Sequence, residues 1–191
     1  MGYKLNPMSS SNYEIREALV SDAEGTAYVH VKGWQTSYIG LIEQSYLDTI
    51  NYEQRLALRK KILQFKDTLQ LVVTFEGKIV GFADAGPLRP KPYNEQLSIL
   101  KDTDVKRGEI YAIYLLAEHQ EKRQGRELYQ HCRHWFEAHG FRQFVTWALA
   151  NNVRARDFYE SEGGKIVGGI TVAIGDSNYL EYCYLFENHA S

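Results

Sequence analysis

The hydrophobic residues of this chain switch repeatedly between the two-residue period of strands and the 3.6-residue period of helices. A strand-like run over residues 109–116 is followed by a polar segment and then by apolar residues at helical spacing from Leu128 to Phe136, which Gly140 ends. Read along the chain, the periods predict a strand, two helices, three strands, a helix, a strand, a helix and two strands. This order indicates an α/β domain with a mixed sheet and helices on both faces.

Capping residues and turn residues set the expected boundaries. Ser21 and Glu24 resemble a capping box before the first helix, Asn51 and Gln54 repeat this pattern, and Asn151 and Asn152 precede a short helix that Gly163 and Gly164 end. The expected strands are residues 14–19, 69–75, 79–85, 109–116, 144–149, 165–170 and 179–186. Residues 87–108 predict a long loop with one helical turn around 95–100, and loops of this length in compact domains usually carry function.

Length and composition exclude several classes of protein. The chain has 191 residues, which suits one domain, and its formal net charge of −2 argues against nucleic acid as the main partner. No stretch approaches the roughly 20 apolar residues of a membrane span. Cys132 and Cys183 are far apart in sequence, so we expect reduced core thiols of a cytoplasmic protein. The polar residues 1–12 are expected to be a flexible leader, and residues 13–191 a single domain.

The junction between the strand 109–116 and the following helix is a candidate phosphate site. A helix N-terminus presents unpaired backbone N–H groups and the positive end of the helix dipole. Gly125 permits a close approach to the backbone, and Lys122, Arg123 and Arg126 add positive charge. The alternative is a plain turn on a solvated surface, which spacing by itself leaves open.

The short helix after residue 152 carries a second candidate. Asn152, Arg156 and Tyr159 follow at steps of four and three, which places them on one side of a helix beside the crevice of an open sheet. Alternatively, Asn152 caps the helix and Tyr159 fills the core.

Glu109 is a candidate general base. Alternation places it on one face of its strand with Tyr111, Ile113 and Leu115, and a carboxylate in such apolar surroundings has a raised pKa. The alternative is an exposed glutamate at the strand end. His131 and His134 lie one helical turn apart, but a zinc site needs about three or four converging ligands, so we expect no metal.

Taken together, these segments resemble the GNAT superfamily of acetyl-CoA-dependent N-acetyltransferases. The family loop Q/R-x-x-G-x-G/A is similar to residues 120–125, with Arg123 in place of the first glycine and Ala117 in place of the usual proline. The family pattern W-x-L-x-x-N-x-x-A-R-x-F-Y-E is nearly complete from Trp147 to Glu160. The resemblance covers almost the whole chain and implies a twisted, mostly antiparallel mixed sheet with helices on both faces.

The resemblance also implies roles for individual residues. Glu109 would be the general base, and Tyr159 would protonate the leaving thiolate of CoA after direct attack by an amine. Acetyl-CoA would be the co-substrate, held at Ile113, Tyr114, Leu115, Gln120, Glu121, Lys122, Arg123, Gln124, Gly125, Arg126, Asn152 and Tyr159. Trp34, Tyr38 and Tyr93 would shape the site of the acceptor, a small-molecule amine or a peptide amine. Many members of the family are dimers, so a homodimer is compatible with the resemblance.

Two other interpretations remain open at this stage. Arg123 in the CoA loop favours a domain of the same fold that binds acyl-CoA without turnover. An interaction module without CoA binding is the third class, because a fold does not fix a function.

Overall fold

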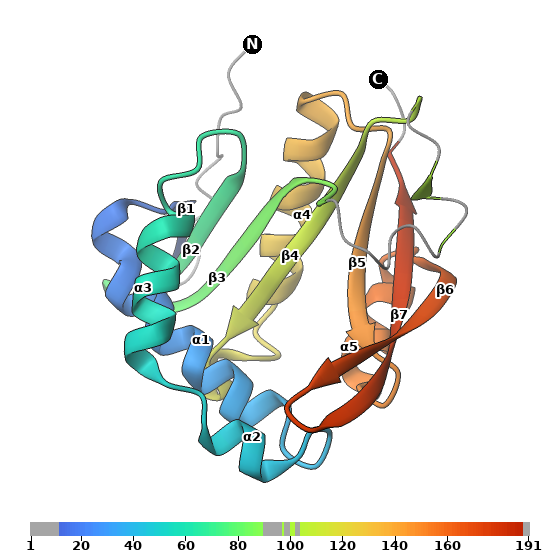
Figure 1. The fold of residues 1–191 in the computed structure, drawn as a ribbon. Coiled ribbons are helices and arrows are strands. Elements are labelled where there is room, and N and C mark those ends of the chain that lie inside the picture. The colour runs from blue at the N-terminus through green and yellow to red at the C-terminus, as the bar shows by residue number, and fades with distance from the viewer. Residues whose placement is uncertain (1–11, 90–96, 98–99, 102–103, 189–191) are drawn as a thin grey trace.

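The computed structural model describes residues 12–89, 97, 100–101 and 104–188. Its centre is one seven-stranded sheet in the order β1-β2-β3-β4-β5-β7-β6 (Figure 1). The strands are β1 (Tyr13–Glu17), β2 (Leu69–Phe75), β3 (Lys78–Pro87), β4 (Arg107–Leu115), β5 (Gln143–Leu149), β6 (Lys165–Ile174) and β7 (Ser177–Glu187). In this sheet β4 and β5 are parallel and the other neighbours are antiparallel.

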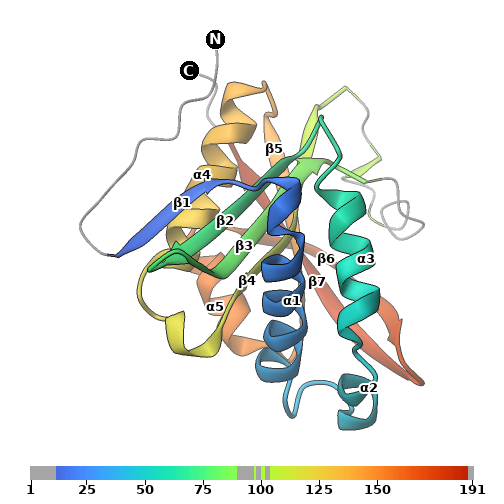
Figure 2. The ribbon, with the colours of Figure 1, turned by 90° about the vertical axis from the view of Figure 1, so that its left-hand side faces the viewer.

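Helices cover both faces of the sheet, as Figure 2 shows from the side. They are α1 (Ala23–Ser37), α2 (Gln44–Asp48), α3 (Tyr52–Ile62), α4 (Gln124–Ala138) and α5 (Val153–Ser161), with 3₁₀ turns η1 (Val20–Asp22) and η4 (Ala117–His119). On one face α1 places Val29 against Val72 and Phe82. On the other face the apolar stripe of α4 packs on β2, β4 and β5 in the largest buried cluster, which α5 also joins. The predicted fold class is therefore confirmed.

A buried ion pair fastens α3 to the sheet. The guanidinium of Arg59, which is fully buried, donates to both carboxylate oxygens of Asp84 on β3. It also lies 4.3 Å from the ring centre of Phe82. Burial raises the pKa of the Asp84 carboxyl, and the charge of Arg59 opposes this effect. The pair fixes the position of α3 on β3, because a buried charge that loses its partner is strongly unfavourable.

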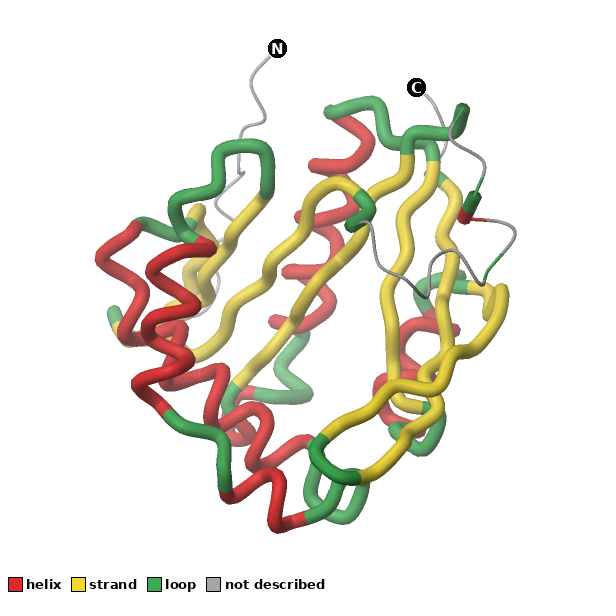
Figure 3. The backbone as a smooth tube through the Cα atoms, in the orientation of Figure 1, coloured by secondary structure: helices red, strands yellow, loops and turns green. Residues whose placement is uncertain are grey.

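The strands β4 and β5 part soon after they meet. Their parallel pairing extends only over Arg107–Glu109 and Gln143–Val145, and beyond it the two strands diverge (Figure 3). A β-bulge in β4 lies next to this point. Ala85 pairs with Ile110 and Asp84 with Ala112, so that Tyr111 is the extra residue.

Because of the bulge, the side chains of β4 do not alternate between the two faces of the sheet as predicted. Ile110, Ile113 and Leu115 all pack in the cluster beneath α4, whereas Ala112 and Tyr114 pack in the cluster beneath α1. The expectation that Ile113 and Leu115 share a face with Glu109 is therefore wrong. An extra residue shifts the period of two by one position, and every side chain beyond it changes face.

The structure differs from the sequence prediction in one helix cap, one additional helix and the length of one hairpin. The expected box of Ser21 and Glu24 is absent from the described hydrogen bonds, because the turn η1 precedes α1 and Asp22 takes the capping position. The Asp22 carboxylate accepts from the Leu19 N–H at 2.7 Å. The helix α2 was not expected, since five residues carry little periodicity. The hairpin of β6 and β7 is longer than predicted.

Asn51 caps α3 as expected, accepting from two backbone N–H groups. Both cysteines are buried and neither forms a disulfide. Within the described residues, no helix is long and apolar enough to cross a membrane. The predicted leader 1–12 falls almost entirely outside the described residues, as does most of the predicted helical turn 95–100.

Candidate active site

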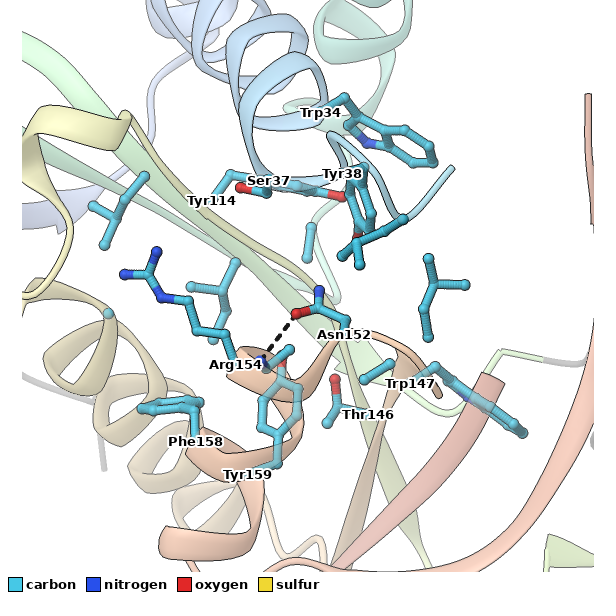
Figure 4. A pocket seen from close by; sticks show the side chains of 18 of the residues that line it. Trp34, Ser37, Tyr38, Tyr114, Thr146, Trp147, Asn152, Arg154, Phe158 and Tyr159 are labelled. Atoms are coloured by element: carbon cyan, nitrogen blue, oxygen red, sulfur yellow. Dashed lines mark hydrogen bonds between the residues drawn. The ribbon is translucent and has the colours of Figure 1, made fainter. Parts of the chain in front are cut away.

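A cleft of about 1070 Å³ opens where β4 and β5 part. Its walls come from the end of α1, from β4, from the loop before α4 and from β5 with the start of α5 (Figure 4). The cleft contains residues from each of the candidate sites that the sequence suggested. One end lies at the loop before α4 and is called the donor end here; the other lies at Trp34 and Tyr38 and is called the acceptor end. Glu109 also lines the cleft, at the point where β4 and β5 part.

The donor end is a loop with unused backbone donors. Within the described part of the chain, none of the backbone N–H groups from Glu121 to Arg126 donates to a protein acceptor. Glu121 and Arg123 have positive φ angles of 62° and 67°, which turn successive N–H groups toward a common concave side. Such an array at a helix N-terminus suits an anion, and a phosphate in particular.

The glycine of this loop is not required by packing. A Cβ added at Gly125 would meet only Leu115 Cδ1, at 3.5 Å, an ordinary contact distance. Glycine in a helix is less stable than alanine by about 0.5–1 kcal/mol, so its presence here calls for another reason. A bare backbone at Gly125 allows a ligand to approach the N–H groups closely. Lys122 of this loop and Gln124, the first residue of α4, do not line the cleft.

The unpaired side of β4 forms the floor of the cleft. The Leu116 N–H donates to Val80 O on β3 at 2.9 Å, so by alternation the backbone groups of Ile113 and Leu115 face the gap toward β5. Two backbone carbonyl oxygens on this side already accept hydrogen bonds from side chains. Gln120 Nε2 donates to Leu115 O at 3.0 Å, and Thr146 Oγ1 donates to Ile110 O at 3.3 Å. A chain of amides lying in the gap would find further backbone partners there.

Tyr159 reaches the middle of the cleft from α5. Burial raises the pKa of its phenol to about 12, and the hydrogen bond to Thr146 opposes this effect. Across the cleft lie Tyr38 and Tyr114, whose pKa values are both raised by burial. All three phenols therefore stay protonated near neutral pH, and Figure 4 shows them around one space.

Asn152 both caps a helix and borders the cleft. Its side-chain oxygen accepts from the Ala155 N–H at 3.1 Å, which caps α5, and the residue also lines the cleft. Arg156, which was expected beside it, points elsewhere and donates to Ala150 O at 3.0 Å. The reason is that Asn152 precedes the helix and has a non-helical backbone (φ −84°, ψ 74°). Helical spacing counted from Asn152 therefore does not predict which side of α5 a residue occupies.

The acceptor end has an aromatic wall. The ring centres of Trp34 and Tyr38 lie 4.7 Å apart, and the Arg55 guanidinium lies 5.6 Å from that of Trp34. The Trp34 indole N–H is buried without a hydrogen-bond partner among the described residues. Glu181 of β7 also lines this end. The third predicted wall residue, Tyr93, lies outside the described residues.

Glu109 is buried rather than exposed at a strand end, with an exposed fraction of 1%. Three donors of Arg89 reach its carboxylate: the backbone N–H at 3.1 Å, Nε at 3.2 Å and Nη2 at 2.5 Å. The Arg89 guanidinium also lies 4.2 Å from the ring centre of Tyr111. No motif in the sequence singled out Arg89, and its place in the predicted functional loop 87–108 was the available signal.

The described residues contain no group of three or more His, Cys, Asp or Glu side chains that could hold a metal. His131 lies outside the cleft, and burial followed by the charge of His134 lowers its pKa.

Comparisons with known proteins agree with this geometry. The family model "Acetyltransferase (GNAT) family" matches residues 34–164, and the chain belongs to this family of acetyltransferases. It is 31% identical over 138 residues to the uncharacterized N-acetyltransferase YuaI of Bacillus subtilis (strain 168), covering 72% of each chain.

Solved structures show the same fold at low identity. The PaiA N-acetyltransferase of Thermoplasma acidophilum, determined with coenzyme A, has a TM-score of 0.64 and 19% identity, covering 88% of this chain and 97% of that one. NAA60 of Arabidopsis thaliana, determined with a bisubstrate analogue, has a TM-score of 0.70 and 12% identity, covering 94% of this chain and 99% of that one.

The role of Gly125 gives a first prediction. We expect Gly125→Ala to raise the free energy of unfolding by up to about 1 kcal/mol, because alanine is the better helix former. The added methyl group should weaken acetyl-CoA binding about 10- to 100-fold, since it blocks hydrogen bonds to a charged group. Urea unfolding and calorimetric titration measure the two effects.

Gly140→Ala is the matched control. Gly140 has a φ of 72° and lies outside the cleft, so its substitution should lower stability and leave binding unchanged. Unchanged affinity in Gly125→Ala would contradict a ligand at this backbone.

Proposed function

We propose that the protein transfers an acetyl group from acetyl-CoA to a primary amine by direct attack through a tetrahedral intermediate. The observation that carries this proposal is the continuity of the cleft. One space joins the unused N–H groups of the loop before α4, the open backbone side of β4, and the side chains of Glu109 and Tyr159. The coenzyme A bound to a structural neighbour supports the choice of donor.

In this proposal the loop from Glu121 to Arg126 holds the pyrophosphate of the donor. The exposed backbone of Ile113 and Leu115 pairs with the amides of the pantetheine arm, and Asn152 lies beside that arm. A backbone N–H on this side of β4 polarises the thioester carbonyl and stabilises the oxyanion. Holding both reactants in one cleft can lower the activation free energy by on the order of 7–11 kcal/mol. No covalent acyl-enzyme is needed for this effect.

Proton transfers complete the reaction. An acceptor amine has a pKa near 10 and arrives as an ammonium ion, so it must lose a proton. Glu109 accepts it directly or through a water, which requires Arg89 to yield one carboxylate oxygen. Tyr159, protonated at neutral pH, donates to the departing sulfur, and the second proton lost by the attacking nitrogen restores its phenol. The aromatic wall of Trp34 and Tyr38 suits a cationic acceptor. Buried thiols outside any disulfide are consistent with a cytoplasmic protein, which we also propose.

Arg123 supports an alternative, a domain that binds acyl-CoA without turnover. It occupies a left-handed conformation with φ 67°, where glycine is favoured and a side chain adds strain of about 1 kcal/mol or more. Its side chain is exposed and also borders the cleft beside the N–H groups. The two functions differ in turnover, since both require the donor site.

Titration with acetyl-CoA tests the donor site. We expect the wild-type protein to bind acetyl-CoA with a dissociation constant on the order of micromolar, and Arg123→Gly to bind at least as tightly because the loop is relieved of strain. A panel of amines, followed by release of free CoA, then tests turnover. Binding by Arg123→Gly alone would favour the non-catalytic alternative, and binding by neither would overturn the proposal.

Tyr159→Phe tests the general acid. We expect kcat to fall by ~10- to 1000-fold while acetyl-CoA affinity changes little, because the variant keeps the ring and loses only the donated proton. Tyr28→Phe on the exposed side of α1 serves as control and should retain wild-type kcat. A wild-type kcat in Tyr159→Phe would remove this residue from the chemistry.

Glu109→Gln tests the base through a pH profile. Without a carboxylate to accept the proton, the amine must arrive unprotonated, and that fraction rises about tenfold per pH unit up to a pKa near 10. We therefore expect a lower kcat at neutral pH and an optimum shifted to higher pH. Glu53→Gln on α3 is the control. An unaltered profile in Glu109→Gln would point to another base.

A further inference from the structure

Arg154 crosses the donor end of the cleft, although no motif in the sequence singled it out. It lies in the first turn of α5, and its side chain extends away from the helix (Figure 4). Its Nη1 donates to Gln120 Oε1 at 2.5 Å, and its Nη2 lies 3.4 Å from Glu121 Oε1. Both partners belong to the loop before α4, so the guanidinium lies beside the unused N–H groups.

Gln120 continues this contact to the sheet. Its side-chain oxygen accepts from Arg154, while its Nε2 donates to Leu115 O at 3.0 Å. Leu115 O is on the side of β4 that has no strand partner. The contact from Arg154 through Gln120 to Leu115, here called the donor-end bridge, therefore joins α5 to β4 across the donor end of the cleft. The Gln120 amide supplies the hydrogen bond that an amide of a bound ligand would make.

The partners of Arg154 hold it weakly. The side chains of Arg154 and Glu121 are 62% and 84% exposed, and exposed ion pairs contribute little to stability. Arg126 of the same region differs, because its Nε donates at 2.5 Å to Glu162, whose side chain is only 8% exposed. Arg154 can therefore exchange its partners, whereas Arg126 is fixed by a buried carboxylate.

A phosphate is a stronger partner for Arg154 than a neutral amide. Guanidinium groups bind phosphates with two parallel hydrogen bonds, and charge on both partners strengthens them. We propose that Arg154 is a phosphate-binding residue for the acyl-CoA donor, and that it exchanges Gln120 for the phosphate when the donor binds. This inference rests on the proposed function, since it requires acyl-CoA in the cleft.

Calorimetric titration of Arg154→Ala with acetyl-CoA tests the binding role. We expect affinity to fall about 10- to 100-fold, as for loss of hydrogen bonds to a charged group. S-acetylpantetheine, which lacks phosphate, should bind wild type and variant alike. A loss that persists with 3′-dephospho-acetyl-CoA assigns Arg154 to the pyrophosphate, and a loss that disappears assigns it to the 3′-phosphate. Arg142→Ala, on the exposed turn before β5, is the matched control.

The outcomes separate this inference from the proposed function. Wild-type binding with unchanged affinity in Arg154→Ala overturns the role of Arg154 and leaves the proposed function intact. Failure of the wild type to bind acetyl-CoA overturns both.

Gln120→Ala tests the exchange itself. Removing the amide breaks the donor-end bridge before the ligand arrives, so stopped-flow measurements should show faster association of acetyl-CoA than in the wild type. A thermal melt that matches the wild type shows that the change is not a loss of folding. An unchanged or slower association rate would overturn the exchange.

Discussion

The parting of β4 and β5 is the constraint on which the site depends. A continuous sheet would satisfy the backbone groups of both strands, but here pairing ends at Glu109 and Val145. Backbone groups left in a sheet need other partners. Thr146 and Gln120 supply two of them from side chains. The remaining groups face a cleft whose shape and donors suit an extended chain of amides, such as the pantetheine arm of the proposed donor.

Charge is distributed unevenly along this cleft. Arginines and unused N–H groups gather at the donor end, where α4 begins, and suit a multiply charged phosphate. The aromatic rings of Trp34 and Tyr38 and the carboxylate of Glu181 border the acceptor end and suit an ammonium ion. The buried carboxylates of Glu109 and Asp84 each have an arginine partner, so the protein contains these charges without leaving either uncompensated. The two ends therefore favour two different reactants in one space.

Local sequence patterns predicted the elements with a strong period or a cap. The amphipathic α4, the strands β2 and β5 and the caps Asn51 and Asn152 follow from contacts within a few residues, so sequence analysis reached them. Short elements such as α2 and the shift of capping from Ser21 to Asp22 depend on the preceding turn. The bulge at Tyr111 depends on pairing with β3, a strand distant in sequence, and reversed the expected faces of Ile113 and Leu115.

The sequence by itself determined the family, the order of the strands and of every described α-helix except α2, and the loop that presents backbone N–H groups. These features follow from residue types at short spacings along the chain. Only the tertiary structure decided which side chains meet. It paired Glu109 with Arg89 and Arg154 with Gln120, residues separated by 20 and 34 positions. It also turned Arg156 away from the cleft and brought Tyr38, Tyr114 and Tyr159 around it. These contacts depend on how elements distant in sequence pack together, and residue spacing along the chain does not determine that packing.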